Sequence, residues 1–387
     1  MRKKIIILFL ISAAILAQKM KLPDNPLEGR IVFEEKGCIE CHSISGYGGN
    51  IGPDLGKQPY YGSISNLAAL IWNHIPKMNR MFRKLHKDRP NFTPTEMSNL
   101  ISFIYYIPYL GQPGSLSRGK LLLQNKGCLD CHSVKGYGEG IAPDFSEIEF
   151  NSSPLFLAQA MWNHLPSMLE LFEKKGKNLG GLEGKDLTDI FTYLTAISKN
   201  VMNTGMSPGN PNKGKKVFIS KGCINCHDIE GEEGDKPGPG LKILTIKNGV
   251  NDIAAVMLNH SSAMMEMMEE NNIEWPEFHK TELADLIAFI YFLNFSDKPG
   301  DPVKGESAFI NVGCSNCHSS DDGVGPNLVE GYKLKSPISL ITKMWNHSGQ
   351  MENETLSLNE EWPQLTAEDF NNIYSFIRNG NKRRKVK

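Results

Sequence analysis

The pentapeptide Cys-x-x-Cys-His occurs four times in this chain of 387 residues, at nearly even intervals. The first cysteines of successive copies are 90, 95 and 91 residues apart, and all eight cysteines of the chain belong to these copies. A repeat of this length has the size of a small domain. The copies are Cys38-Ile39-Glu40-Cys41-His42, Cys128-Leu129-Asp130-Cys131-His132, Cys223-Ile224-Asn225-Cys226-His227 and Cys314-Ser315-Asn316-Cys317-His318.

Each repeat shares a longer pattern around its pentapeptide. A run that opens on a glycine ends in Gly-Cys, which predicts a two-turn helix ended by glycine. A glycine-rich loop with one proline follows the histidine. Further on, a helical stretch carries Asn-His, and apolar residues at i, i+3, i+4 and i+7 predict a closing helix. The opening glycines are Gly29, Gly119, Gly214 and Gly305, and the loop prolines are Pro53, Pro143, Pro239 and Pro326.

Short, turn-rich segments separate the repeats at residues 111–114, 207–211 and 298–302. The closing helix of the first repeat has a start signal in Thr93-Pro94-Thr95-Glu96. The sequence therefore predicts an all-α chain of four tandem small helical domains. We expect these domains to touch, because the linkers between them are short. The predicted boundaries are 24–111, 114–200, 209–296 and 300–380.

The first 17 residues have the features of a secretory signal peptide. A positive segment, residues 2–4, precedes an apolar stretch of 13 residues from Ile5 to Ala17. A helix that spans a bilayer needs about 20 residues, so this stretch is too short. Ile15-Leu16-Ala17 is a plausible cleavage site, and an uncleaved anchor is the alternative. We therefore expect a periplasmic or extracellular protein of bacterial origin.

Composition excludes several other classes of protein. Apolar residues make up 40% of the chain and charged residues 22%, which is unlike a disordered chain or a coiled coil. The 42 basic and 43 acidic residues nearly cancel, which argues against nucleic-acid binding as the main function.

Three ordinary uses of cysteine compete for the pentapeptides. They are disulfides, zinc sites and thioredoxin-like redox pairs. None of these needs a histidine directly after every pair, whereas covalent haem attachment does. Two thiols one helical turn apart can each form a thioether to the same haem, and the next residue then lies where an imidazole nitrogen can bind the iron. The four pentapeptides therefore predict four covalently bound haem c groups.

These residues resemble the small class I c-type cytochromes, here as a four-fold tandem over residues 24–380. The resemblance rests on the short helix before the pentapeptide, the Gly-Pro-x-Leu loop and the closing helix. It implies that the first and last helices of each domain cross. It also implies that the loop-proline carbonyl accepts a hydrogen bond from the proximal histidine, which is His42, His132, His227 or His318. In the second repeat Ala142 replaces the loop glycine, a mild departure.

The sixth ligand of each iron has two candidates. The histidine of Asn-His and the methionine four residues later recur in all four repeats and would share a helix face. The resemblance favours methionine, and Pro76 and Pro166 would break the helix and free the methionine to reach the haem. Bis-histidine ligation is common in multihaem proteins and stays the alternative. The methionines are Met78, Met168, Met264 and Met351, and the histidines are His74, His164, His260 and His347.

A large apolar residue lies two positions before each of these histidines. It is Trp72, Trp162 or Trp345, and Leu258 in the third repeat. We expect these side chains to pack against the haem.

Together these predictions point to an electron carrier. An iron with two protein ligands can change its oxidation state but has no open position for a substrate. We expect an exported tetrahaem c-type cytochrome that relays electrons between redox partner proteins and is not an enzyme. It would have no nucleic-acid or small-molecule partner, and association with a membrane complex stays open. The alternative is a haem enzyme that reduces peroxide or a nitrogen oxide at one open haem. Its candidate places are the third and fourth repeats, where Ser261-Ser262 and Ser348-Gly349 replace the proline segment.

Overall fold

A computed structural model describes most of the chain between residues 27 and 383. We call the described parts of the four repeats unit 1 (27–107), unit 2 (113–202), unit 3 (209–295) and unit 4 (301–383). The predicted signal peptide and parts of the first two linkers lie outside the described residues, so the predictions made on them stay predictions. The described residues are 27–57, 62–107, 113–151, 153–177, 181–199, 201–202, 209–229, 236–243, 249–319, 323–329 and 334–383.

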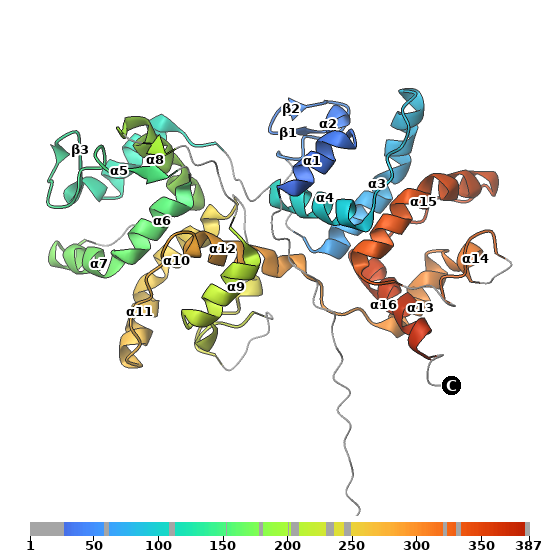
Figure 1. Cartoon of the computed structure of the whole chain (residues 1–387). Coiled ribbons are helices and arrows are strands. Elements are labelled where there is room, and N and C mark those ends of the chain that lie inside the picture. Colours follow the sequence, from blue (N-terminus) through green and yellow to red (C-terminus); the bar gives the residue numbers. More distant parts are fainter. Residues whose placement is uncertain are drawn as a thin grey trace, which may run out of the picture.

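The units are mostly helical and share one order of elements (Figure 1), as the predicted all-α class requires. The first helices are α1 (Glu28–Glu35), α5 (Leu116–Asn125), α9 (Pro211–Ser220) and α13 (Pro302–Asn311). One helical turn at the cysteines follows, in α2 (Cys38–Cys41), η2 (Cys128–Asp130), η3 (Cys223–Asn225) and α14 (Ser315–His318). The middle helices are α3 (Ile64–Lys84), α6 (Pro154–Asn163) with α7 (Leu165–Lys174), α10 (Asn251–Asn259) with α11 (Ser261–Glu270), and α15 (Pro337–Ser357). The closing helices are α4 (Pro94–Tyr106), α8 (Gly184–Ile197), α12 (Glu282–Phe292) and α16 (Ala367–Arg383).

Strands are short and few among the described residues. Antiparallel pairs follow the cysteines of units 1 and 2 and shape the loops there: β1 (Ser43–Ile44) with β2 (Tyr47–Gly48), and β3 (Ser133–Val134) with β4 (Tyr137–Gly138). One parallel pair, β5 (Phe150–Asn151) with β6 (Val201–Met202), connects two parts of unit 2. Unit 3 adds two single turns, η4 (Leu241–Ile243) and η5 (Leu293–Phe295).

The first and closing helices of each unit cross closely, as the resemblance implies. The crossings join α1 to α4, α5 to α8, α9 to α12 and α13 to α16. A Cβ atom added to Gly29 would overlap the backbone carbonyl of Asn99 in α4, and one added to Gly305 would overlap that of Asn372 in α16. Gly119 and Gly214 stand in the same relation to α8 and α12. The repeated opening glycine therefore sets the distance between the two helices, which frame the core of the unit.

Two predictions about helix ends have different outcomes. The start of α4 is confirmed, because the side chain of Thr93 accepts a hydrogen bond from the Glu96 amide and the Glu96 carboxylate accepts one from Thr93. The predicted break at Pro76 is wrong, since α3 continues through it. In units 2 and 3 the middle helix is interrupted at His164 and at His260. The interruption at His260 occurs although no proline follows it. Packing of α3 against unit 4 outweighs the hydrogen bond that Pro76 removes.

The units associate in two pairs that do not follow their order in the chain. Helices α15 and α16 of unit 4 pack on α3 and α4 of unit 1, and α10 and α12 of unit 3 pack on α6 and α8 of unit 2. Figure 1 shows the two halves, with the blue and red units in one and the green and yellow units in the other. We call them the 1–4 pair and the 2–3 pair. Units 2 and 3, which a short linker joins, touch as expected, whereas unit 1 packs on unit 4.

Each pair is held by reciprocal hydrogen bonds from the asparagines of Asn-His. The Asn73 side chain donates to the Leu365 carbonyl at 2.9 Å and accepts from the Leu365 amide at 2.9 Å. Asn346 of unit 4 makes the same two bonds to Phe92 of unit 1, at 2.8 and 2.9 Å. In the 2–3 pair, Asn163 binds Phe278 and Asn259 binds Leu182 in the same way. Each asparagine thus satisfies a backbone amide and a carbonyl of the other unit.

The two pairs meet at their closing helices. Tyr105 at the end of α4 and Tyr291 at the end of α12 exchange hydrogen bonds, each hydroxyl donating to the backbone carbonyl of the other residue at 3.4 and 2.8 Å. Both side chains are 2% exposed or less, so these bonds are buried. The spatial order of the units is therefore 4–1–3–2. None of the helices within the described residues is both long enough and apolar enough to cross a membrane.

Candidate haem sites

The histidine of each pentapeptide is fixed by the loop that follows it. Its Nδ1 atom lies 3.1, 2.9, 3.0 and 2.9 Å from the carbonyl oxygen of Pro53, Pro143, Pro239 and Pro326 in units 1 to 4. A carbonyl oxygen can only accept, so Nδ1 carries the proton and donates it. The lone pair is then on Nε2, the nitrogen that is left to bind a metal. The hydrogen bond implied by the family resemblance is confirmed in all four units.

Each of these histidines faces the histidine of Asn-His in its own unit. The ring centroids of His42 and His74 are 6.3 Å apart, and those of His132 and His164 are also 6.3 Å apart. In units 3 and 4 the pairs His227–His260 and His318–His347 are each 6.0 Å apart. The same spacing thus occurs four times between residues that lie on different elements.

This spacing fits one metal ion between two imidazoles. A metal–nitrogen bond of about 2.0 Å on each side, with about 1.2 Å from each nitrogen to its ring centroid, gives about 6.4 Å between centroids. The angle between the two rings varies from 30° in unit 4 to 72° in unit 2. The paired histidines are therefore the residues that would hold a haem iron in each unit.

The first cysteine of each pentapeptide lies on the inner side of this site. Burial raises the pKa of Cys38, Cys128, Cys223 and Cys314 to about 11. Redox-active and zinc-binding cysteines have the opposite property, a lowered pKa that favours the thiolate. A neutral, partly buried thiol is suited to a thioether, which carries no charge. No disulfide joins any of the eight cysteines, all of which lie within the described residues.

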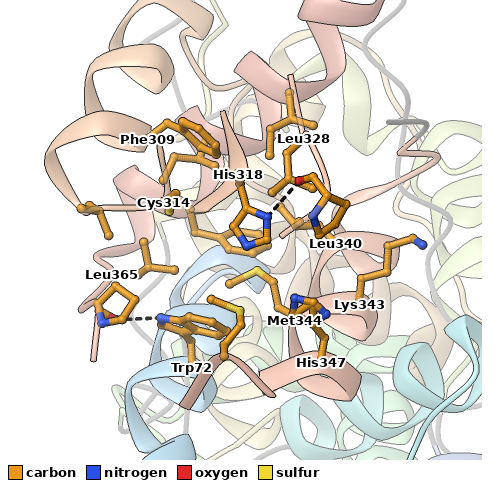
Figure 2. A pocket seen from close by; sticks show the side chains of 17 residues that line it. Trp72, Phe309, Cys314, His318, Leu328, Leu340, Lys343, Met344, His347 and Leu365 are labelled. Carbon is orange, nitrogen blue, oxygen red and sulfur yellow. Dashed lines mark hydrogen bonds between the residues drawn. The ribbon is translucent and has the colours of Figure 1, made fainter. Parts of the chain in front are cut away.

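Cavities in units 1, 3 and 4 join these groups. They hold about 1040, 1230 and 710 Å³ of space, open mouths included, which is the size range of cofactor sites. Each is lined by the first cysteine, the loop proline and both histidines of its unit. Figure 2 shows the unit 4 cavity, with Cys314, His318 and His347 at its surface among apolar side chains. In units 1 and 3 both cysteines and both histidines of the unit line the cavity, and in unit 4 Cys314 lines it with the two histidines.

Burial favours the neutral imidazole form, which can bind a metal, in three of the four histidines of Asn-His. Burial, with a smaller contribution from the facing His42, lowers the pKa of His74 below its ordinary value. Burial has the same effect on the pKa of His260 and of His347. A lowered pKa favours the neutral imidazole at neutral pH. In unit 2, the Nδ1 atom of His164 lies 2.5 Å from the Ala160 carbonyl, so Nδ1 donates and Nε2 is the nitrogen left to bind a metal.

The predicted methionine ligands line the same cavities in three units. Met78, Met264 and Met351 are lining residues in units 1, 3 and 4, and Met168 lies on α7, which begins directly after His164. Methionine ligation stays a prediction. The imidazole spacing favours the alternative, the four histidines.

Unit 2 departs from the other three at its proximal side. A Cβ atom added to Gly52, Gly238 or Gly325 would overlap the ring of the nearby pentapeptide histidine. Unit 2 has Ala142 at this position and so carries that methyl group. His132 keeps its bond to Pro143 and stacks on Phe145, with centroids 4.3 Å apart. The departure is therefore tolerated, but the proximal ring has a different neighbour.

The tryptophans line the cavity of another unit, which sequence reasoning did not foresee. Trp345 of unit 4 lines the cavity of unit 1, Trp72 of unit 1 lines that of unit 4, and Trp162 of unit 2 lines that of unit 3. Sequence reasoning also missed that the asparagine beside each histidine binds another unit. The sequence does indicate that the tryptophan and the asparagine matter, since Trp-Asn recurs beside three of the four histidines. Periodicity within one repeat cannot say which unit a surface residue meets.

Comparisons with known proteins agree with this geometry. Residues 27–107 and 211–293 each match the family model described as Cytochrome c. These regions are nearly all of units 1 and 3. No curated protein matches the chain, and no solved structure matches it. The two matches support a cytochrome c-type repeat protein with covalently attached haem and haem-based electron transfer.

Proposed function

We propose that this chain is an exported tetrahaem c-type cytochrome that relays electrons between redox partner proteins. Each unit would hold one haem c through its two cysteines, with the histidine of the pentapeptide as proximal ligand. The pentapeptide in all four repeats and the family matches in two of them support this count. The signal-like segment at residues 1–17 supports export to the periplasm or the cell exterior.

The distal ligands in this proposal are His74, His164, His260 and His347. The observation that carries it is the constant distance between paired imidazoles. The two histidines are 32, 32, 33 and 29 residues apart along the chain in units 1 to 4, yet their ring centroids stay 6.0–6.3 Å apart. A distance that is kept while the connecting chain changes length points to a requirement of the site.

The residues of the chain then decide what the sites can do. A bound haem supplies one-electron exchange at its iron. The loop-proline carbonyls hold the proximal imidazoles in the tautomer that can ligate, and mostly apolar side chains line the cavity of unit 4. If both histidines of a unit bind the iron, a small molecule would have no position at which to bind it. These features favour an electron carrier with protein partners.

The alternative is a haem enzyme with one open iron in unit 3 or unit 4. It requires one distal histidine that lies away from its proximal partner. The rings of His227 and His260 and those of His318 and His347 are 6.0 Å apart, which is no wider than in units 1 and 2. This observation supports the carrier.

The test is a haem count by pyridine haemochrome on the purified protein, with the oxidised absorption spectrum beside it. We expect four haems per chain and no absorption band at about 695 nm, the band that marks methionine bound to ferric haem. Four haems with a band that scales with all four would assign the distal positions to the methionines. Fewer than four haems would contradict the tetrahaem proposal. Carbon monoxide binding to the native reduced protein would favour the enzyme.

A further inference from the structure

Three of the haem cavities have a wall that another unit supplies. Trp345 lies two residues before His347 in unit 4, but it lines the cavity of unit 1. Trp72 of unit 1 in turn lines the cavity of unit 4, as Figure 2 shows. In the other pair, Trp162 of unit 2 lines the cavity of unit 3. Among the lining residues described for these cavities, the tryptophan of the unit's own middle helix is absent from units 1 and 4.

Hydrogen bonds across the pair hold these rings in place. The Trp345 indole N–H donates to the Pro90 carbonyl of unit 1 at 2.8 Å, and that of Trp72 donates to the Pro363 carbonyl of unit 4 at 2.7 Å. Trp162 makes the same bond to Pro276 of unit 3 at 2.7 Å. The three tryptophans are 8% exposed or less, so they are buried by the neighbouring unit.

Ring contacts fix the same side chains on their other faces. The guanidinium of Arg89, from unit 1, lies 4.2 Å from the Trp345 ring, a cation–π contact. The rings of Trp72 and Trp362 are tilted by 32° with centroids 4.4 Å apart, and Trp162 stacks on Trp275 at 4.3 Å. Trp72 and Trp345 also border one small cavity between the two units. Both rings therefore lie between the two haem sites of the 1–4 pair.

We propose that the haem sites are composite, so that a tryptophan of one unit packs against the haem of the other unit in its pair. This inference rests on the proposed tetrahaem function. The three residues of the motif Trp-Asn-His then act in two different units. The histidine serves the iron of its own unit, the asparagine binds the backbone of the partner unit, and the tryptophan packs against the partner's haem.

The two pairs differ in one respect. In the 1–4 pair both units supply a tryptophan, whereas in unit 3 the equivalent residue is Leu258. Unit 2 therefore receives no indole from its partner at this position. An apolar aromatic wall changes the polarity next to a haem and with it the reduction potential. The composite arrangement makes the potential of one haem depend on a residue of the other unit.

The experiment uses the full chain with all its haems and the variant Trp345→Leu, which copies the natural leucine of unit 3. The readouts are the shifted haem-methyl NMR signals of the oxidised protein and a redox titration. The low-spin haem-methyl signals that disappear in His74→Ala belong to haem 1, and those that disappear in His347→Ala belong to haem 4. We expect Trp345→Leu to shift the signals and potential of haem 1 and to leave those of haem 4 in place. Trp345→Phe should restore most of the wild-type pattern.

Trp362→Leu is the matched control. It removes a tryptophan from the same interface that is not among the residues lining the cavity of unit 1, and should leave haem 1 unchanged. Trp162→Leu gives the second test and should shift only haem 3. A change confined to haem 4 in Trp345→Leu, or no change at any haem, would overturn the inference. If Trp345→Leu loses one haem, loss of haem 1 supports the inference and loss of haem 4 contradicts it. A wild-type count below four would instead contradict the proposed function.

Discussion

The indole N–H of Trp362 donates a hydrogen bond to the backbone carbonyl of Trp72 at 3.2 Å. Inside a regular α-helix that carbonyl would bond to the amide four residues on, but this residue is Pro76, which has no amide hydrogen. The carbonyl that the proline leaves unpaired is thus satisfied by unit 4. The 2–3 pair repeats the arrangement, since Trp275 donates to the Trp162 carbonyl at 3.1 Å, and Pro166 lies four residues after Trp162.

This relationship explains why only two repeats contain the proline. Units 1 and 2 have it, and they face the tryptophan-bearing loops of units 4 and 3. In unit 4 the equivalent position is Gly349, and the residue that lies over Trp345 is Arg89 and not a tryptophan. The prolines therefore belong to the contact between units.

Removing a distal histidine should open one haem to external ligands. In His347→Ala we expect carbon monoxide to bind one haem in four after reduction, because the iron loses its second imidazole. Difference spectra against the reduced protein measure the bound fraction. Met351→Ala is the control and should bind none. If Met351→Ala opens the site and His347→Ala does not, methionine is the ligand.

Replacing an asparagine of Asn-His should weaken the contact between the two units of a pair. Asn73→Leu keeps a similar volume but leaves the buried amide and carbonyl of Leu365 without partners. We expect the free energy of unfolding of the 1–4 pair to fall by about 1–3 kcal/mol. The midpoint of urea unfolding, followed by fluorescence, measures it. Asn311→Leu, at an exposed position on α13, should change stability by less than about 0.5 kcal/mol. Equal effects would contradict the assigned role.

A methyl group added at a helix crossing should also lower the free energy of unfolding. In Gly305→Ala the new Cβ overlaps the Asn372 carbonyl, so α13 and α16 must move apart. Overpacking of this kind costs about 1–3 kcal/mol, although alanine is the better helix former. Thermal unfolding of the full chain measures the change. Gly181→Ala is the control, because a Cβ there meets nothing within 4 Å, and a loss as large as that of Gly305→Ala would count against the crossing argument.

Unit 2 should lose stability in acid through Asp189. Burial opposes ionisation of this carboxyl, but hydrogen bonds from Lys185, Arg118 and the Ser115 amide outweigh it and hold its pKa below the ordinary value of 3.8. A lowered folded-state pKa stabilises the fold above the ordinary value, and the contribution is lost as pH falls through the folded-state pKa. Asp189→Asn should cost about 2 kcal/mol at neutral pH and flatten the acid limb of the stability curve. An unchanged limb would assign the acid sensitivity to another group.

Much of each unit could be predicted from its own residues. The short helix before Cys-x-x-Cys-His and the start of α4 at Thr93 depend on neighbours close in sequence, and both are present. The bond from His42 to Pro53, which the family resemblance implied, is also present. The pair of candidates for the distal ligand was also visible. The choice between them was not, because His74 and Met78 lie on one helix and only their position relative to His42 separates them.

What the sequence by itself determined is the repeated unit: its helices, its cysteines and histidines, and the glycine (Gly29 in unit 1) that lets the first helix approach the closing helix. These follow from local conformational preference and from hydrophobic periods that each repeat carries in full. Only the tertiary structure decided that unit 1 pairs with unit 4 and unit 2 with unit 3, and that Trp345 lines the cavity of another unit. The physical reason is that a side chain on the outer face of a helix gains its energy from whatever surface covers it, and nothing in the order of the repeats specifies that surface.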